Sequence, residues 1–297
     1  MNKAIKITEV SPIIKVRSYR CHVTQNKWVN SRYKHLCLTS ENIDFASMTQ
    51  AGQFYQLKCP QTNDLNPFLL RPMSVYSLGA SQNNQDKNQI EFLYNVMGLG
   101  TQALSSLVID APMDIVGPLG NSFYFKPSFK KILLIVRGVG LATLAPLLKQ
   151  AYQHNIGINV IMSARHQDDL MQDQFLQGID LNESYAKMHL NVHCLYDSDG
   201  SSSMETLETL VSHILKTNTI DALYTCGSER ILMLLQKLLI NYPDICAEVA
   251  LEQRMACGMG VCLSCVKLFR TQDGETKFRR ICRDGPIFPI SEVAYFG

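Results

Sequence analysis

The alternation of hydrophobic and polar positions changes character near residue 128. From about residue 5 to 125, short runs of β-branched and aromatic residues are separated by Gly, Pro and Asn, and clear examples span 54–57, 75–78 and 90–96. The polar stretch 81–89 lies between two of these runs and is typical of a hairpin loop. Short strands at this spacing predict an antiparallel β-barrel or sandwich.

Beyond Lys131 the pattern becomes apolar strand, glycine turn and apolar helix. It predicts strands at 132–136, 158–162, 188–195 and 222–226, with helices at 141–150 and 229–240. Strands that alternate with helices predict a doubly wound parallel sheet of the α/β class. The last fifty residues have little periodicity and hold several cysteines. We therefore expect three parts, residues 1–127, 128–245 and 246–297.

Composition and charge narrow the functional classes. The chain of 297 residues is 46% hydrophobic and 18% charged, with a formal net charge of +2, which is typical of a globular protein. The chain has no block of Lys and Arg residues interleaved with aromatics, so the sequence does not indicate a nucleic-acid partner. The first ten residues lack the apolar stretch of a secretory signal, and no apolar run is long enough to cross a bilayer. We expect a soluble cytoplasmic protein without membrane insertion.

The ten cysteines fall into two groups. In a reducing cytosol scattered cysteines are free thiols, usually buried, and this applies to Cys21, Cys37, Cys59, Cys194, Cys226 and Cys246. The other four, Cys257, Cys262, Cys265 and Cys282, form C-x4-C-x2-C followed by a distant fourth cysteine. This is the plant-type spacing for a [2Fe–2S] cluster. The alternatives are a zinc site, which usually pairs its ligands in two short knuckles, and unligated thiols.

Two segments of the first half could bind a flavin nucleotide. Arg71-Pro72-Met73-Ser74 combines a cation for a phosphate, a stiff backbone and a hydroxyl for a planar heterocycle, although it could be only an edge strand that begins with Pro. Gly98-Leu-Gly100-Thr101 precedes a helix-like segment at 102–107 and could hold a phosphate, or it could be a turn capped by Thr101. With the segment 117–120 downstream, binding of an FAD pyrophosphate explains both segments better than an edge strand and a capping turn do.

Two strand ends of the second half could bind a dinucleotide. Arg137-Gly138-Val139-Gly140 lies in the turn where a nicotinamide dinucleotide rests its pyrophosphate, but Thr143 occupies the place of a third glycine. Residues 224–228 end another strand at the same predicted edge. Cys226 there either flanks a nicotinamide ring or is an ordinary buried thiol, and the sequence leaves both readings open.

Together these segments resemble the ferredoxin–NADP reductase superfamily, and most closely the electron-transfer subunits of class 1B dihydroorotate dehydrogenases. The resemblance covers most of the chain from about residue 50. It rests on the segments 71–74, 98–101, 117–121, 137–140, 221–227, 254–262 and 282–286. The cysteine segments are specific to this subfamily, whereas the glycine segments are not. The first fifty residues match poorly.

The resemblance implies a ferredoxin reductase-like fold with an FAD barrel, an NAD domain and a small [2Fe–2S] module. It implies FAD contacts from Arg71, Pro72, Met73, Ser74, Leu93, Tyr94, Asn95, Gly100 and Thr101. It implies NAD(H) contacts from Gly138, Gly140, Cys226 and Gly227, and cluster ligation by Cys257, Cys262, Cys265 and Cys282. Family members often have Arg where this chain has Asn95, and a small residue where it has Arg137.

The implied activity is that of an oxidoreductase subunit in pyrimidine biosynthesis. Dihydroorotate reduces FMN in a separate catalytic subunit, and electrons pass through this chain's cluster and FAD to NAD+, in a heterotetramer. The scheme requires no catalytic acid or base from this chain. The alternatives are a related reductase subunit, of sulfide dehydrogenase or of an NADH-dependent ferredoxin:NADP oxidoreductase, and a non-enzymatic module with structural zinc.

Overall fold

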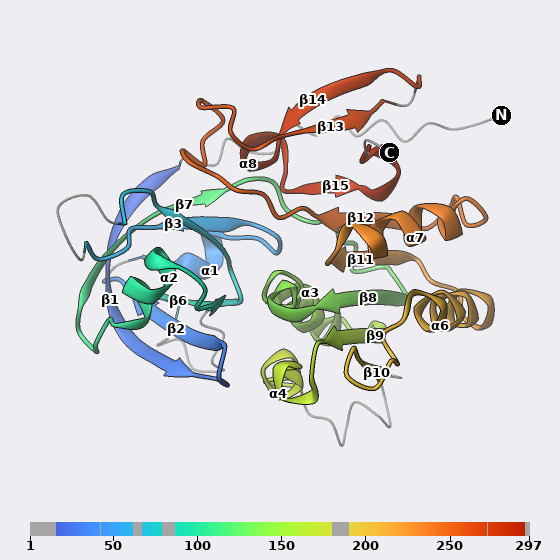
Figure 1. Cartoon of the computed structure of the whole chain (residues 1–297), viewed down its shortest axis with the longest axis horizontal. Helices are drawn as coiled ribbons and strands as arrows, with labels where there is room; N and C mark the ends of the chain where they lie inside the picture. The colour runs from blue at the N-terminus through green and yellow to red at the C-terminus, as the bar shows by residue number, and fades with distance from the viewer. Residues whose placement is uncertain are drawn as a thin grey trace.

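A computed structural model describes residues 16–41, 43–61, 67–78, 87–179, 190–271 and 273–294 (Figure 1). Residues 1–15, most of the predicted 81–89 loop and the first two residues of the predicted 188–195 strand lie outside this described part. Within it, no helix is both long enough and apolar enough to span a membrane.

The first half of the chain forms a curled, seven-stranded antiparallel sheet in the order β4-β3-β7-β1-β2-β6-β5. The short helices α1 (Phe45–Met48) and α2 (Leu99–Ser105) accompany it. The strands are β1 (Arg17–Trp28), β2 (Tyr33–Thr39), β3 (Phe54–Leu57), β4 (Arg71–Ser74), β5 (Ser77–Leu78), β6 (Gln89–Asn95) and β7 (Pro112–Leu119). The curled sheet is a half-barrel rather than a closed barrel, because its two edge strands among the described residues, β4 and β5, do not pair with each other.

Alternation along the strands decides which side chains fill the half-barrel. On β1, Cys21 and Val23 point inward while their neighbours are exposed, as the period of two in a strand requires. The predicted strand 75–78 is shorter than expected: only Ser77–Leu78 pairs with β6, while 71–74 forms its own strand beside β3. The long strand β1 was not predicted, because its exposed face is almost continuously polar.

The second half forms a six-stranded sheet in the order β10-β9-β8-β11-β12-β15, parallel except for β15. Its strands are β8 (Lys131–Arg137), β9 (Gly157–Ala164), β10 (Leu190–Tyr196), β11 (Ala222–Cys226), β12 (Cys246–Ala250) and β15 (Ile287–Pro289). The connecting turns and helices are η1 (Gly138–Gly140), α3 (Leu141–Gln153), η2 (Gln167–Asp169), α4 (Gln172–Phe175), α6 (Met204–Thr217) and α7 (Glu229–Leu239).

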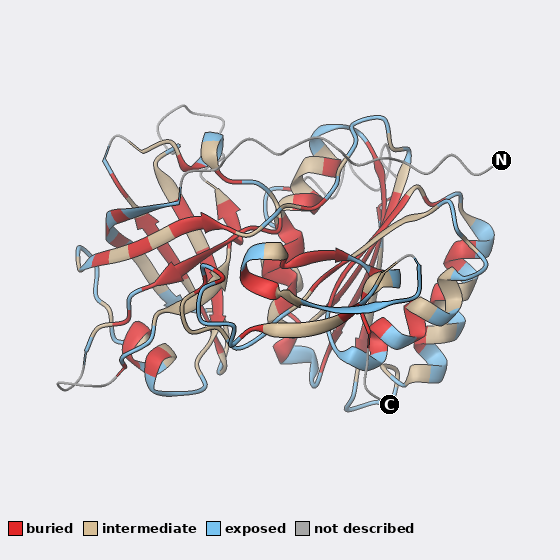
Figure 2. Ribbon diagram, turned by 90° about the horizontal axis from the view of Figure 1, so that it is seen from above, coloured by how far each residue is buried: buried red, intermediate tan, exposed pale blue. Residues whose placement is uncertain are grey.

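Strand β8 shows why this sheet is doubly wound. Ile132, Leu134 and Val136 pack in one core cluster with α3, whereas Leu133 and Ile135 pack in another with α6 and α7. A strand buried on both faces reads as a continuous apolar run. Figure 2 shows the buried strands between helices whose outer faces are exposed. The predicted doubly wound sheet is therefore present.

The C-terminal part combines a two-stranded ribbon with strands of the large sheet. The ribbon pairs β13 (Val266–Arg270) with β14 (Thr276–Arg280), and α8 (Ile281–Asp284) and η3 (Ile290–Glu292) flank β15. The expected boundary after residue 245 cuts through the parallel sheet, because β12 pairs with β11 and β15 pairs with β12. The cysteine segment is therefore anchored in the six-stranded sheet at both of its ends, by β12 before it and by β15 after it.

The half-barrel and the parallel sheet are joined by polar contacts as well as by a shared core. Asn30 Nδ2 donates to the carbonyl oxygen of Asp168 at 2.9 Å, and Arg32 Nη1 lies 3.2 Å from Asp169 Oδ2. The Tyr76 hydroxyl donates to Gln177 Oε1 at 3.0 Å. These contacts fix the half-barrel against the helices around β9.

Candidate cofactor sites

The four clustered cysteines come together in space as two pairs. Cys265 Sγ and Cys282 Sγ lie 3.2 Å apart, which is far longer than a disulfide bond. Cys257 Sγ accepts hydrogen bonds from the amides of Met259 at 3.4 Å and Cys262 at 3.5 Å. The loop therefore wraps backbone N–H groups around one sulfur.

The two pairs differ in their electrostatic surroundings. A hydrogen bond from the Ser264 hydroxyl, with further bonds from backbone amides, lowers the pKa of Cys262 to about 6. Burial, followed by the neighbouring Cys265, raises the pKa of Cys282 to about 12. Two buried thiolates at this separation repel each other unless a cation lies between them. The 265/282 pair is therefore suited to a shared metal.

An ion pair at the end of the ribbon supports the cysteine loop. Arg280 Nη2 lies 2.8 Å from Asp284 Oδ1, and its Nη1 donates to the carbonyl oxygen of Gly260 at 3.3 Å. Asp284 Oδ2 also accepts from the Arg280 amide at 2.8 Å. The aspartate of the Cys-x-Asp-Gly-Pro segment thus holds the arginine that contacts the loop between the first two cysteines.

Gln56 on β3 connects the cysteine loop to the segment Arg71–Ser74. It is the register partner of Pro72, and a Cβ built on Gly258 would lie 2.4 Å from Gln56 Nε2. Both amide atoms of Gln56 are buried and have no hydrogen-bond partner among the described residues. The predicted flavin strand and the predicted cluster loop therefore meet across one side chain.

Arg71 and Gly100, both predicted to contact FAD, are in contact with each other. A Cβ at Gly100 would lie 2.3 Å from Arg71 Nε, so only glycine lets the guanidinium lie this close to α2. The helix begins at Leu99 and ends at Ser105, not at 102–107 as predicted. Thr101 is not the cap: its hydroxyl accepts from the amides of Met97 and Gly98 instead.

The predicted FAD residues of β6 point to opposite sides of the sheet. Leu93 belongs to the core cluster between the half-barrel and α3, whereas Tyr94 lies inside the half-barrel with its hydroxyl 2.9 Å from Asn26 Oδ1. Asn95, the register partner of Tyr33, is half-buried. Tyr94 can therefore offer a ligand on the outer face only its backbone.

The glycine turn after β8 and the end of β11 lie side by side at the carboxyl edge of the parallel sheet. The connection from β8 runs to β9 on one side, and the connection from β10 crosses to β11 on the other, so β8 and β11 flank the topological switch point. Open α/β sheets bind ligands outside the carboxyl ends of their strands at this point. A Cβ at Gly140 would lie 3.0 Å from Cys226 Sγ, so the two strand ends adjoin.

Cys226 is almost fully buried, at 1% exposure. Its Sγ lies 3.8 Å from Thr143 Oγ1 and 3.8 Å from Glu252 Oε1. Burial raises the pKa of Cys226 well above that of a free thiol, so it is protonated at neutral pH. The structure shows the buried thiol, beside the glycine turn, and the contact with a nicotinamide ring stays a prediction.

An ion pair with Asp197 directs the Arg137 side chain away from the glycine turn. Its Nη2 lies 2.6 Å from Asp197 Oδ2, directly after β10, and this bond, with one from Ser202, lowers the pKa of Asp197. The arginine side chain therefore spans the carboxyl ends of β9 and β10. Its Cβ lies 3.7 Å from the position that a Cβ of Gly227 would occupy, just after β11.

Sequence reasoning missed Gln56, Glu252 and Asn121. Asn121 ends the Gly-Pro-Leu-Gly-Asn segment, and its side chain pairs with the backbone of Ile287 through two hydrogen bonds of 2.9 Å. The segment itself was noted, but no sequence signal shows its contact with 285–287. Gln56 lies within an ordinary strand pattern and Glu252 lies just after β12, and neither carries a signal of its own.

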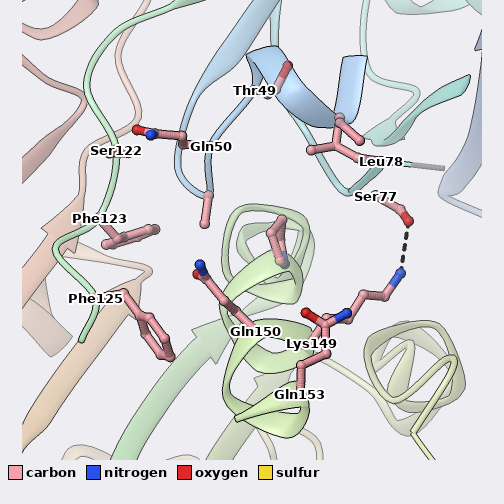
Figure 3. Close-up of a pocket in the computed structure, with 13 residues that line it drawn as sticks. Thr49, Gln50, Ser77, Leu78, Ser122, Phe123, Phe125, Lys149, Gln150 and Gln153 are labelled. Carbon is pink, nitrogen blue, oxygen red and sulfur yellow. Dashed lines mark hydrogen bonds between the residues drawn. The ribbon is translucent and has the colours of Figure 1, made fainter. Parts of the chain in front are cut away.

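A separate cavity of about 420 Å³ lies between α1, β5 and α3 (Figure 3). Its lining includes Gln50, Ser77, Phe123 and Lys149. None of the predicted FAD or NAD(H) residues lines it.

The comparisons with known proteins agree with these features. Residues 252–294 match the model of the iron–sulfur cluster binding domain of dihydroorotate dehydrogenase B. Over 251 residues, 83% of this chain and 87% of the relative, the sequence is 28% identical to the dihydroorotate dehydrogenase B (NAD(+)) electron transfer subunit of Shouchella clausii. The subunit of the same name from Desulforamulus reducens is 29% identical over 85% of this chain and 89% of its own. The chain is a homologue of these electron transfer subunits. The predicted resemblance to these subunits is thereby confirmed.

Solved structures give the same fold. A chain of the NADH-dependent reduced ferredoxin-NADP oxidoreductase superposes with a TM-score of 0.68, at 21% identity, over 92% of this homologue and 89% of that chain. The ferredoxin-NADP+ reductase of Plasmodium falciparum gives 0.60 at 14% identity, over 78% and 96%. The predicted ferredoxin reductase-like fold, with a C-terminal iron–sulfur binding domain, is confirmed. FAD, a [2Fe–2S] cluster and NAD(H) are the cofactors that this fold and domain support.

Proposed function

We propose that this electron transfer subunit conducts electrons between a partner flavoprotein and NAD(H), through a [2Fe–2S] cluster and FAD that its own residues hold. The observation that carries the proposal is the contact of Gln56 with the Gly258 loop. It brings the flavin strand and the cluster loop together at one point. The adjoining strand ends at Gly140 and Cys226 supply a separate edge for the nucleotide.

The proposed cluster ligands are Cys257, Cys262, Cys265 and Cys282. Their arrangement supports iron–sulfur ligation because two thiols are buried as a close pair, while the other two lie in a loop rich in backbone N–H donors. Such donors stabilise thiolate ligands and tune a cluster's potential. When bound, the cluster exchanges one electron at a time. The chain's part is to hold the four sulfurs and to shield the 265/282 pair from water.

The proposed FAD contacts are Arg71, Pro72, Met73, Ser74, Leu93, Asn95, Gly100 and Thr101, with Tyr94 contributing backbone only. Arg71 lies against α2 with its guanidinium near the helix's first turn, which suits a phosphate oxygen. The buried amide of Gln56, which has no described partner, suits a polar cofactor atom on this side of β3. FAD can exchange electrons singly or in pairs, and the residues of β4 would orient it.

The proposed NAD(H) contacts are Gly138, Gly140, Cys226 and Gly227. Their place at the switch point of the parallel sheet supports this assignment. A protonated, buried Cys226 packs a nicotinamide ring without adding charge beside it. The ion pair with Asp197 directs the Arg137 guanidinium toward the end of β10, away from the ends of β8 and β11 where the nucleotide would lie.

The proposed partner is an FMN-containing dihydroorotate dehydrogenase catalytic subunit, in a cytoplasmic heterotetramer of pyrimidine biosynthesis. The names of the relatives support this choice. The cysteine loop also exposes an apolar rim, with Met259, Val261 and Leu263 exposed by 44%, 80% and 57%. Apolar side chains around a redox centre provide a surface that a protein partner can cover. This chain needs no catalytic acid or base in the scheme.

The direct test is reconstitution with the catalytic subunit that co-purifies with this chain. Under anaerobic conditions, dihydroorotate oxidation should yield orotate and NADH in equal amounts. The variant Cys262→Ser should abolish NAD+ reduction, while the catalytic subunit still reduces an artificial dye. The matched variant Cys246→Ser, outside the cluster, should keep both activities.

Other outcomes separate the alternatives. Reduction of the complex by sulfide or by reduced ferredoxin, with no response to dihydroorotate, would assign the chain to a related reductase. Dye reduction without NAD+ reduction in the unaltered complex would contradict the nucleotide site. A colourless protein that holds zinc on the four cysteines would contradict electron transfer altogether.

A further inference from the structure

We propose that the outer face of the half-barrel holds a second metal site, a divalent zinc site formed by His35, Cys37 and Glu91. The site is separate from the four clustered cysteines and does not rest on the proposed function. The three ligand atoms lie within 4.8 Å of one another. His35 Nε2 is 2.8 Å from Glu91 Oε2 and 3.4 Å from Cys37 Sγ.

Strand geometry brings the three side chains to one face. His35 and Cys37 are two residues apart on β2, so they point to the same side of the sheet. Cys37 is the register partner of Glu91 on the neighbouring strand β6. Two adjacent strands therefore fix all three ligands, and this placement depends on backbone pairing rather than on flexible loops.

The donor set suits zinc better than a hard cation. Imidazole nitrogen, thiolate sulfur and carboxylate oxygen are the ligands that Zn²⁺ takes, at about 2.0 to 2.3 Å. Tetrahedral angles at those bond lengths place ligand atoms about 3.3 to 3.7 Å apart. The Cys37–His35 separation already fits, and the His35–Glu91 separation needs a widening of only a few tenths of an ångström. Ligation replaces the thiol proton of Cys37, which leaves to solvent.

Two glutamines contact the proposed ligands Glu91 and His35 through side-chain amides, and such hydrogen bonds orient metal ligands. Gln89 Nε2 donates to Glu91 Oε1 at 2.9 Å, while Oε2 faces His35 in the site. The side-chain amide of Gln25 on β1 lies 3.0 Å from His35 Nδ1. A 180° flip of this amide presents its oxygen to Nδ1–H and gives up the hydrogen bond from Gln25 Nε2 to Cys37 Sγ at 3.5 Å, and the opposite ring nitrogen is then free for the metal.

The proposed site is partly open to solvent. The side chains of His35 and Glu91 are each 13% exposed, so an ion and a water molecule can reach them. The Tyr76 ring covers His35 edge-on with ring centroids 5.3 Å apart. Lys149 lies beyond that ring and is held by Ser77 Oγ at 2.8 Å (Figure 3). Three protein ligands with an open fourth position describe a site that a water molecule completes.

The test uses the full-length protein with its iron and flavin in place. After incubation with zinc chloride and passage over a chelating resin, we expect about one zinc per chain with the iron content unchanged. X-ray absorption at the zinc edge should show a single sulfur neighbour at about 2.3 Å, with the other neighbours nitrogen or oxygen. Four sulfur neighbours would place the zinc on the clustered cysteines and overturn the proposal.

Variants sharpen the test. His35→Gln and Glu91→Gln should lose the retained zinc with iron and flavin unchanged, and Gln89→Leu should weaken zinc binding about tenfold to a hundredfold. Cys21→Ser is the control. Cys21 is a buried thiol on β1 that belongs to no metal-ligand group among the described residues, and this variant should retain zinc as the unaltered protein does. Absence of retained zinc in the unaltered protein, or equal retention by His35→Gln, would contradict the site. Because the absorption measurement needs no variant, it decides the proposal even if a variant fails to fold.

Discussion

Gln56 Nε2 lies 2.4 Å from the position that a Cβ of Gly258 would occupy. Strand β3, which pairs with β4, therefore contacts the cysteine loop so closely that a side chain at residue 258 has no room. Gly258 also has φ of +68°, in the left-handed region. Both conditions require glycine. The contact supports the electron path that we propose from the cluster loop to the segment Arg71–Ser74.

Replacing Gly258 therefore tests this contact. Gly258→Ala should lower the iron content by more than half, because the new methyl group displaces either Gln56 or the loop. Gly274→Ala is the control: Gly274 has φ of +87°, but nothing lies within 4 Å of its Cβ position. Both variants bear about 1 to 2 kcal/mol of backbone strain, and only the first should lose iron. Equal loss of iron in the two variants would show that strain alone matters.

Arg71 should contribute most of the charge that holds FAD. Arg71→Ala should weaken FAD binding about tenfold to a hundredfold, as expected for the loss of about 1.5 to 3 kcal/mol in a charge-assisted hydrogen bond. Arg20→Ala is the control, since Arg20 is an exposed arginine of the same sheet paired with Asp114. Flavin fluorescence after dialysis measures the retained FAD. If both variants keep their flavin equally, Arg71 has no part in the site.

The apolar rim of the cysteine loop should be where the partner docks. Val261→Glu should weaken the complex with the catalytic subunit at least tenfold, while the visible spectrum of the cluster stays unchanged. Ile240→Glu is a matched control, because Ile240 is 77% exposed and lies just after α7. Analytical ultracentrifugation of the mixed subunits gives the two affinities. A complex unaffected by Val261→Glu would move the docking surface elsewhere.

Glu248 gives a pH dependence of stability with a definite sign. Its Oε2 accepts from the Tyr124 amide at 2.8 Å, and burial raises its pKa to about 7 from an ordinary 4.5. The folded protein therefore binds this proton more tightly than the unfolded chain, and stability falls as the pH rises from about 4.5 to 7. Glu248→Gln should raise the free energy of unfolding by about 1 to 3 kcal/mol at pH 8 and much less at pH 5. Thermal melting at the two pH values measures it, and an equal gain at both would contradict the assignment.

Local patterns were enough to predict the two sheets and the candidate residues, because apolar runs and cysteine spacing are properties of short segments. The strand 222–226 and the start of the following helix at Glu229 agree with the structure residue for residue. The start of α2 was misjudged because Thr101 turns back to the amides of Met97 and Gly98, a choice that depends on loop geometry. The contacts of Gln56, of Asn121 and of the His35–Cys37–Glu91 group join segments that are distant in the chain, and one sequence does not show which distant segments meet.

Anaerobic titration of the purified chain with NADH tests the central claim most directly, with visible absorbance and electron paramagnetic resonance recorded together. The chain should contain one FAD and two irons, as a single [2Fe–2S] cluster requires. NADH should bleach the flavin and produce the resonance signal of a reduced [2Fe–2S] cluster in the same titration. A flavin and cluster that stay oxidised in excess NADH, yet are reduced by dithionite, would contradict the proposed path to the nucleotide.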